Sequence, residues 1–345
     1  MKPKFKAIIL TTVTGAVLAA PAMAQFTGDN QTNVISGVTS NWGGDYYVGS
    51  NYVYDALFIE SGGVLSNGVA YIGFETGAVN NAVIVSGSGS VWSNDVHVYV
   101  GTYGADNSLV ISNQGQVHDH HGVLGHGGDS TNNSVVVTDS GSVWSNRARL
   151  IVGGSGTGNN LVISNQGKVF NVQGEVGTSG NNNRVLVSGS GSVWSNLDNL
   201  FVGYFGSGNS VIVSNQAALF NDYGEVGYSS DSNNVLVTGS GSVWSNALSL
   251  YVGIYGSANS LVVANQGKVF NQYGFLGYYA NSSNNSVTVT GSGSVWSNSY
   301  DLSVGVYGSD NSLVVSNQGK VFNYNAKIGW TASSSNNSVV VTGTG

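Results

Sequence analysis

An internal repeat dominates this sequence and restricts the folds open to it. The pentapeptide Ser-Val-Trp-Ser-Asn recurs every 50 or 52 residues, with its tryptophan at 92, 144, 194, 244 and 296. Midway between lies a related unit with phenylalanine at 170, 220, 270 and 322, so the two series together advance by 24 to 26 residues. Such a period is typical of a stacked solenoid, in which each unit, or rung, covers the apolar face of its neighbour.

Each rung holds three short apolar runs separated by Gly, Asn and Ser. In the rung at 209–227 they occupy 211–213, 218–220 and 225–226. Short aliphatic runs bounded by turn-forming residues indicate strands, and nothing in the rung has the length or period of a helix. The sequence therefore predicts an all-β fold, a right-handed parallel β-helix of three sheets with about 25 residues per rung and about twelve rungs.

Comparison between rungs indicates which side chains face inward. The first and third positions of the first run stay aliphatic, as in Leu161 and Ile163. Lys168, Lys268 and Lys320 each stand two residues before a phenylalanine, and because side chains alternate along a strand, the ring should share the outward side with the lysine. This predicts an external aromatic ladder at about 4.8 Å per rung, made of Trp92, Trp144, Phe170, Trp194, Phe220, Trp244, Phe270, Trp296 and Phe322. The alternative is a wide corner that folds these rings into the core.

The ends of the chain differ from the repeats. Residues 1–24 hold three lysines, an apolar run from 7 to 20 and an Ala-Met-Ala exit, which is typical of a secretory signal peptide and short for a membrane anchor. Residues 25–52 are predicted to form an N-terminal cap or a degenerate first rung, and 53–345 the β-helix. Residues 336–345 reproduce the opening of a tryptophan rung and then stop, so we expect a fragment of a longer product.

Charge is sparse in this chain. It has 10 basic and 17 acidic residues and a net charge of −7, which disfavours nucleic acid and anionic membranes as partners. The chain has no cysteine, which suits bacterial export better than a disulfide-stapled secreted domain. Asparagines recur at the turns, where their amides are expected to hydrogen-bond along the stack.

All five histidines lie between residues 97 and 126. The candidate ligands for a divalent metal such as zinc are His118, His120, His121 and His126, because imidazoles at close spacing are usual zinc ligands. Their spacing matches no known metal site, and a histidine can also stack in an aromatic column. We therefore expect surface histidines, with no metal and no other cofactor.

Sequence signals for an enzyme are weak. Gly125-His126-Gly127 resembles a short motif of polygalacturonases, but that chemistry needs paired carboxylates and the chain has no Asp-Asp pair. A pectate lyase would need an arginine near an acidic calcium site, and Arg147, Arg149 and Arg184 have no acidic cluster beside them. A protein without enzymatic activity is expected; the alternative is a polysaccharide lyase or hydrolase of the pectin-degrading β-helix type.

A signal peptide followed by repeats such as Ser-Gly-Ser-Gly-Ser-Val-Trp-Ser-Asn and Asn-Gln-Gly-Lys-Val resembles the passenger domains of Gram-negative autotransporters. The resemblance covers residues 53–345. It implies a β-helical stalk, secreted or displayed at the cell surface, that acts in adhesion or aggregation and contacts glycans or other copies of itself. The family's C-terminal outer-membrane translocator barrel is a further partner that the resemblance implies, and we expect it to be missing from this fragment.

Overall fold

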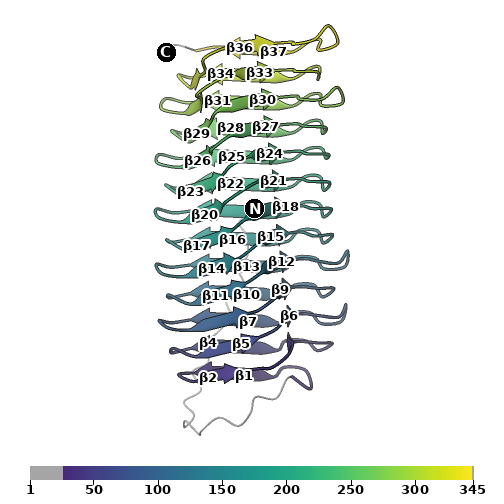
Figure 1. Ribbon diagram of the computed structural model, residues 1–345, viewed down its shortest axis with the longest axis vertical. Helices are drawn as coiled ribbons and strands as arrows, with labels where there is room; N and C mark the ends of the chain where they lie inside the picture. Colours follow the sequence, from purple (N-terminus) through teal and green to yellow (C-terminus); the bar gives the residue numbers. More distant parts are fainter. Residues whose placement is uncertain (1–25, 344–345) are drawn as a thin grey trace.

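The computed structural model describes residues 26–343, so the predicted signal peptide lies outside the described part of the chain. Strands of successive rungs stack into three sheets, and every strand pair is parallel, which gives one elongated solenoid (Figure 1). The prediction of an all-β, three-sheet parallel β-helix with about twelve rungs is confirmed. No helix long and apolar enough to cross a membrane occurs within residues 26–343.

Each rung contributes one strand to each sheet, in the order sheet A, sheet B, sheet C. Sheet A consists of β1 (Thr32–Ser36), β4 (Ala56–Glu60), β7 (Ala82–Ser86), β10 (Ser108–Ser112), β13 (Ser134–Thr138), β16 (Asn160–Ser164), β19 (Arg184–Ser188), β22 (Ser210–Ser214), β25 (Asn234–Thr238), β28 (Ser260–Ala264), β31 (Ser286–Thr290), β34 (Ser312–Ser316) and β37 (Ser338–Val341).

Sheets B and C each have twelve strands. Sheet B consists of β2 (Thr39–Asn41), β5 (Val64–Asn67), β8 (Val91–Asn94), β11 (Gln116–Asp119), β14 (Val143–Asn146), β17 (Lys168–Asn171), β20 (Val193–Asn196), β23 (Ala218–Asn221), β26 (Val243–Asn246), β29 (Lys268–Asn271), β32 (Val295–Asn298) and β35 (Lys320–Phe322). Sheet C consists of β3 (Tyr46–Val48), β6 (Ala70–Ile72), β9 (His97–Val100), β12 (His121–Leu124), β15 (Arg149–Val152), β18 (Gln173–Val176), β21 (Leu200–Val202), β24 (Gly224–Val226), β27 (Ser249–Val252), β30 (Tyr273–Leu276), β33 (Leu302–Val304) and β36 (Ala326–Ile328).

The first rung is degenerate in sequence but regular in structure. Its strands β1, β2 and β3 pair in parallel with β4, β5 and β6 of the second rung.

The apolar interior follows the predicted alternation in sheet A. Leu161 and Ile163 of β16 are fully buried, whereas the residue between them is half-buried on the outer side. In the next rung Leu161 pairs with Val185, so inward side chains stack directly on one another. Burying one such side chain contributes about 1.5–3 kcal/mol, and the column repeats in every rung.

The predicted external ladder is wrong for its tryptophans, which lie in the core. Trp194 pairs with Val169 rather than Phe170, and Ser195 takes the place opposite the phenylalanine ring. The tryptophan rung has four turn residues before β20 and the phenylalanine rung has three before β17, which shifts the aromatic ring by one place. The fully buried indoles are Trp92, Trp144, Trp194, Trp244 and Trp296.

The phenylalanines do lie outside, on sheet B, with 38% to 52% of each residue exposed: Phe170, Phe220, Phe270 and Phe322. They occur only in alternate rungs, so neighbouring rungs place a serine between two rings. The continuous aromatic column that the sequence predicted is therefore absent from sheet B in the described residues.

Glycines in sheet C make room for the indoles. A Cβ atom at Gly174 would lie 2.3 Å from Asn196 Oδ1 and 2.9 Å from Trp194 Cζ2, so only glycine fits beneath the ring. The indole N–H is satisfied by the rung below, where Asn171 Oδ1 accepts a 2.7 Å hydrogen bond from Trp194 Nε1. Rungs with a large Trp–Leu pair thus alternate with rungs that carry a small Val–Gly pair.

A second asparagine series closes the corner before sheet A. Asn133 Nδ2 donates to Asn159 Oδ1 at 3.1 Å, and Asn159 Nδ2 donates to Asn183 Oδ1 at the same distance. The backbone N–H of each also bonds to the next amide oxygen. The predicted hydrogen bonding between turn asparagines along the stack is confirmed.

Candidate functional site

A band of aromatic rings covers the outer side of sheet C and the turns that follow its strands. Each turn starts at a glycine with a positive φ, such as Gly203 (φ 80°) and Gly227 (φ 72°), where a side chain would be strained. The residues after it continue the hydrogen bonding between rungs, as when Tyr228 N donates to Gly203 O at 2.9 Å. Side chains at equal positions of these turns are therefore held one above another.

The rings in the upper half of the band stack closely. Parallel pairs with centroids 4.3 to 4.8 Å apart are Tyr255 with Tyr279, Tyr204 with Tyr228, and Tyr251 with Phe275. Edge-on contacts join the pairs, for example between Tyr228 and Tyr255 at 5.6 Å. Stacked and edge-on packing fixes each ring in place, which produces a preformed aromatic surface.

Between these rings lies a groove of about 380 Å³. It spans four rungs and is lined by Asn199, Tyr223, Glu225, Tyr228, Tyr251, Ile254, Tyr255, Tyr278 and Tyr279. A concave, mostly aromatic site with a few polar groups is the usual form of a small-ligand site. We refer to it as the tyrosine groove.

Glu225 is the charged group of the tyrosine groove. It is 7% exposed, and one carboxylate oxygen accepts a 3.2 Å hydrogen bond from Asn199 Nδ2 while Oε2 has no partner. Burial, and secondarily the charge of Asp198, raises the pKa of Glu225 to about 7. The carboxyl group can therefore be present in both protonation states near neutral pH, as a hydrogen-bond donor or an acceptor.

Glu225 differs in its partners from the glutamate at the equivalent position of another rung. Glu175 occupies the same position two rungs earlier, on the other side of Phe201. Its oxygens accept hydrogen bonds from Gln173 Nε2 at 2.7 Å and Thr178 Oγ1 at 2.6 Å, and Arg149 Nε lies 3.4 Å away. Glu225 lacks comparable partners, so a ligand could supply them.

The histidines predicted as candidate metal ligands separate into two groups. His120 and His121 lie with His97, and one ring nitrogen from each falls within 4.8 Å of the others. His118 lies instead on sheet B, where its Nε2 is 3.2 Å from Gln116 Oε1, and His126 packs edge-on against Tyr99. The candidate set His118, His120, His121 and His126 is therefore corrected to His97, His120 and His121.

Known protein families give no match to this chain, and neither do curated protein sequences. Among solved structures, the chain is similar to the crystal structure of a TibC-catalysed, hyper-glycosylated fragment of TibA, residues 55–350. The two are 14% identical, the alignment covers 92% of this chain and 97% of that one, and the TM-score is 0.44. Function has to be inferred from this chain's own residues.

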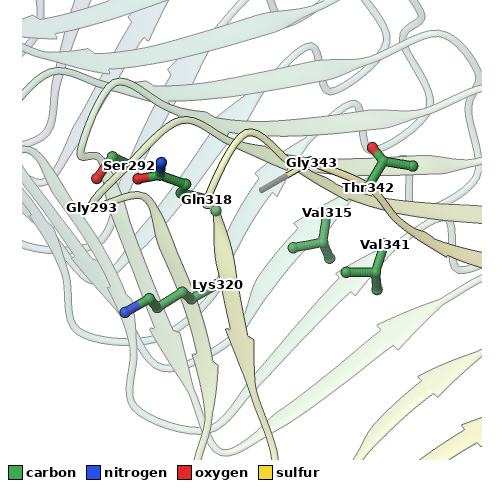
Figure 2. Close-up of a pocket in the computed structure, with 9 residues that line it drawn as sticks. Ser292, Gly293, Val315, Gln318, Lys320, Val341, Thr342 and Gly343 are labelled. Atoms are coloured by element: carbon green, nitrogen blue, oxygen red, sulfur yellow. The ribbon is translucent and has the colours of Figure 1, made fainter. Parts of the chain in front are cut away.

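A larger hollow of about 880 Å³ lies at the last described rungs, where Val315 and Val341 stand side by side (Figure 2). Gln318 and Lys320 line its rim. The equivalents of Val315 are buried core residues in the earlier rungs, so this hollow is the interior of the stack rather than a site shaped for a ligand.

Sequence reasoning missed the tyrosine groove. Its rings occupy positions that differ from rung to rung: Tyr228 and Tyr278 correspond to Thr178 two and four rungs away. The available signal was the concentration of tyrosines directly after the third-run glycines between residues 204 and 279.

Proposed function

We propose that this protein is a secreted or surface-displayed, adhesin-like interaction protein that binds carbohydrate through the tyrosine groove. The observation that carries the proposal is the groove itself, in which stacked tyrosine rings surround a buried carboxylate with a free oxygen. Aromatic rings pack on the apolar C–H faces of sugar rings, and Glu225 and Asn199 can bond to sugar hydroxyl groups.

The scaffold suits such a role. The groove lies on the continuous sheet C, and its rings come from strands and tight turns rather than from long loops. A site on rigid elements loses little conformational entropy on binding, which favours affinity for a flexible polar ligand. The signal-peptide pattern of residues 1–24 and the autotransporter-like repeats support display or release outside the cell.

A glycan array followed by titration calorimetry tests the proposal. Replacing Tyr255 or Tyr279 by Ala should weaken the binding of the selected glycan by about tenfold, since a stacked ring contributes roughly 1 kcal/mol or more. Phe270→Ala is the matched control, because this ring is 38% exposed but lies on sheet B, outside the groove. It should leave affinity unchanged.

Two results would contradict the proposal. One is an array without a reproducible ligand; the other is an equal loss of affinity in the groove variants and in Phe270→Ala. Self-association through the same rings is the rival use of this face. It would appear as a concentration-dependent sedimentation coefficient that Tyr255→Ala abolishes, without any glycan.

A second candidate function is cleavage of the bound polysaccharide. Burial and the charge of Asp198 raise the pKa of Glu225 to about 7, in the range that a general acid needs, and Asp198 is a second carboxyl group close by. Release of reducing ends from the bound glycan would favour it. Glu225→Gln should then abolish release while binding persists, whereas a pure binding protein would show no release in either form.

A further inference from the structure

We propose that His97, His120 and His121 form a binding site for one divalent transition-metal ion. One ring nitrogen from each histidine lies within 4.8 Å of the other two, and the three residues come from adjacent rungs. The site is separate from the tyrosine groove and does not depend on the proposed function.

The register of sheet C brings these residues together. His97 begins β9 and His121 begins β12, and the two are direct partners across the parallel pair. Their rings are 4.9 Å apart, and His120, at the corner just before β12, packs edge-on against His121 at 4.4 Å. A metal ligand from His97 is therefore supplied one rung below the ligands from His120 and His121.

The nitrogens are available for a metal. His97 Nδ1 is buried and has no hydrogen-bond partner, so its lone pair or proton is unsatisfied. Burial and the neighbouring His120 lower the pKa of His97. Burial, followed by the charges of His120, His97 and Arg149, lowers the pKa of His121 to about 4. Burial therefore favours the neutral form of both imidazoles, which is the form that binds metal.

The ligand set selects the class of ion. Three imidazoles without carboxylate or thiolate suit Zn²⁺, Ni²⁺, Co²⁺ or Cu²⁺ and do not suit the oxygen-seeking Ca²⁺ or Mg²⁺. Nitrogen ligands of a tetrahedral zinc lie about 3.3 Å apart, so the rings must close by roughly 1.5 Å. The exposed His120 can supply most of this movement. A fourth coordination position would remain for water or for a donor from another molecule.

Two neighbours limit the affinity. His121 Nδ1 accepts a long, 3.3 Å hydrogen bond from Arg149 N, which metal binding through that nitrogen would break. The Arg149 side chain also brings a positive charge, although Glu175 lies 3.4 Å from it and offsets part of that charge. We therefore expect a site weaker than structural zinc sites, and Arg149→Gln should tighten it.

The test is titration calorimetry with ZnCl₂ and NiCl₂ on the purified protein without a polyhistidine tag, supported by the visible absorption of bound Co²⁺. We expect one ion per chain. His97→Ala, His120→Ala and His121→Ala should each weaken binding at least tenfold, whereas the matched controls His118→Ala and His126→Ala should not change it. Circular dichroism checks the fold, and the exposed His120 carries the test if the His97 variant fails to fold.

Absence of saturable binding would overturn the proposal. So would equal losses in the control variants and in the three ligand variants, because the ion would then sit elsewhere. Binding that survives His120→Ala and His121→Ala together would also exclude the site.

Discussion

Asp119 Oδ2 accepts a 2.6 Å hydrogen bond from Trp144 Nε1, while the second carboxylate oxygen, Oδ1, is buried without a partner. In equivalent rungs this place belongs to an asparagine, and Asn171 Nδ2 donates onward to Asn196 Oδ1 at 2.5 Å. The next amide above Asp119, Asn146 Oδ1, is likewise unpartnered. When the Asp119 carboxyl group is ionised, this exchange of nitrogen for oxygen leaves two acceptors unsatisfied in the core.

Asp119→Asn should therefore stabilise the protein. Burial raises the pKa of Asp119 to about 8, against smaller lowering effects of Trp144 and Arg147, so folding keeps this carboxyl group protonated where the unfolded chain ionises it. Restoring the amide removes that cost and completes the hydrogen-bond pair. We expect a gain of about 1–3 kcal/mol in the free energy of unfolding at pH 8, measured by urea denaturation with a chelator present.

The reciprocal change provides the control. Asn171→Asp breaks the same pair in a rung that has it, and should destabilise the protein by a similar amount. A neutral or destabilising Asp119→Asn would show that the unpaired oxygens are satisfied in some other way.

The two kinds of aromatic residue should respond differently to truncation. Trp194→Ala empties a fully buried indole site and should cost about 3–5 kcal/mol. Phe170→Ala removes a ring that is 38% exposed and should cost about 1–2 kcal/mol. Thermal melts of both variants check this, and equal losses would contradict the placement of tryptophan inside and phenylalanine outside.

The glycine beneath each indole gives a sharper test of the packing. Gly174→Ala places a methyl group against Asn196 Oδ1 and Trp194, and overpacking of this kind costs about 1–3 kcal/mol. Gly128→Ala is the matched control, because nothing lies within 4 Å of its added Cβ atom. Only the first variant should melt at a lower temperature; a stable Gly174→Ala would mean that the rungs can separate to admit the methyl group.

Stability should fall with pH through Glu225. Its pKa is raised by burial from the ordinary value of 4.5 to about 7, so between these pH values the folded state holds a proton that the unfolded state has lost. The contribution of Glu225 to the free energy of unfolding is constant below pH 4.5. It falls between pH 4.5 and about pH 7 and is constant again above that pH. Relative to the wild type, Glu225→Gln should gain stability over that interval, up to about 3 kcal/mol. A stability difference that does not change from pH 4 to pH 8 would refute this assignment.

The repeat predicted the fold because each rung restates the same physical constraints. The positions of Leu161 and Ile163 are aliphatic in every copy from residue 57 onward, and this recurrence alone defines an inward column. The tryptophans were misplaced because they were matched to the phenylalanines by ring type. Matching Asn171 to Asn196 instead would have set Trp194 opposite Val169.

The sites were harder to predict because they depend on departures from the repeat. Tyr255 and Tyr279 meet only through the register of two turns. Alignment of the repeat units reveals the residues that the units share, and these tyrosines are not shared. His97 and His121 are likewise joined by pairing between strands rather than by local spacing. The clustering of histidines in the sequence identified residues 97–126 as unusual. It did not show that His97, His120 and His121 come together.

The fit between Trp194 and Gly174 has a consequence for how such a protein can change in length. Rungs with a Trp–Leu pair alternate with rungs with a Val–Gly pair. Loss or duplication of one rung would therefore place two indole rungs, or two Val–Gly rungs, next to each other. Loss or duplication of two rungs would restore every contact. The chain should therefore tolerate growth or shortening only in paired units, each extending the rod by roughly 9.6 Å, and natural length variants should preserve this parity.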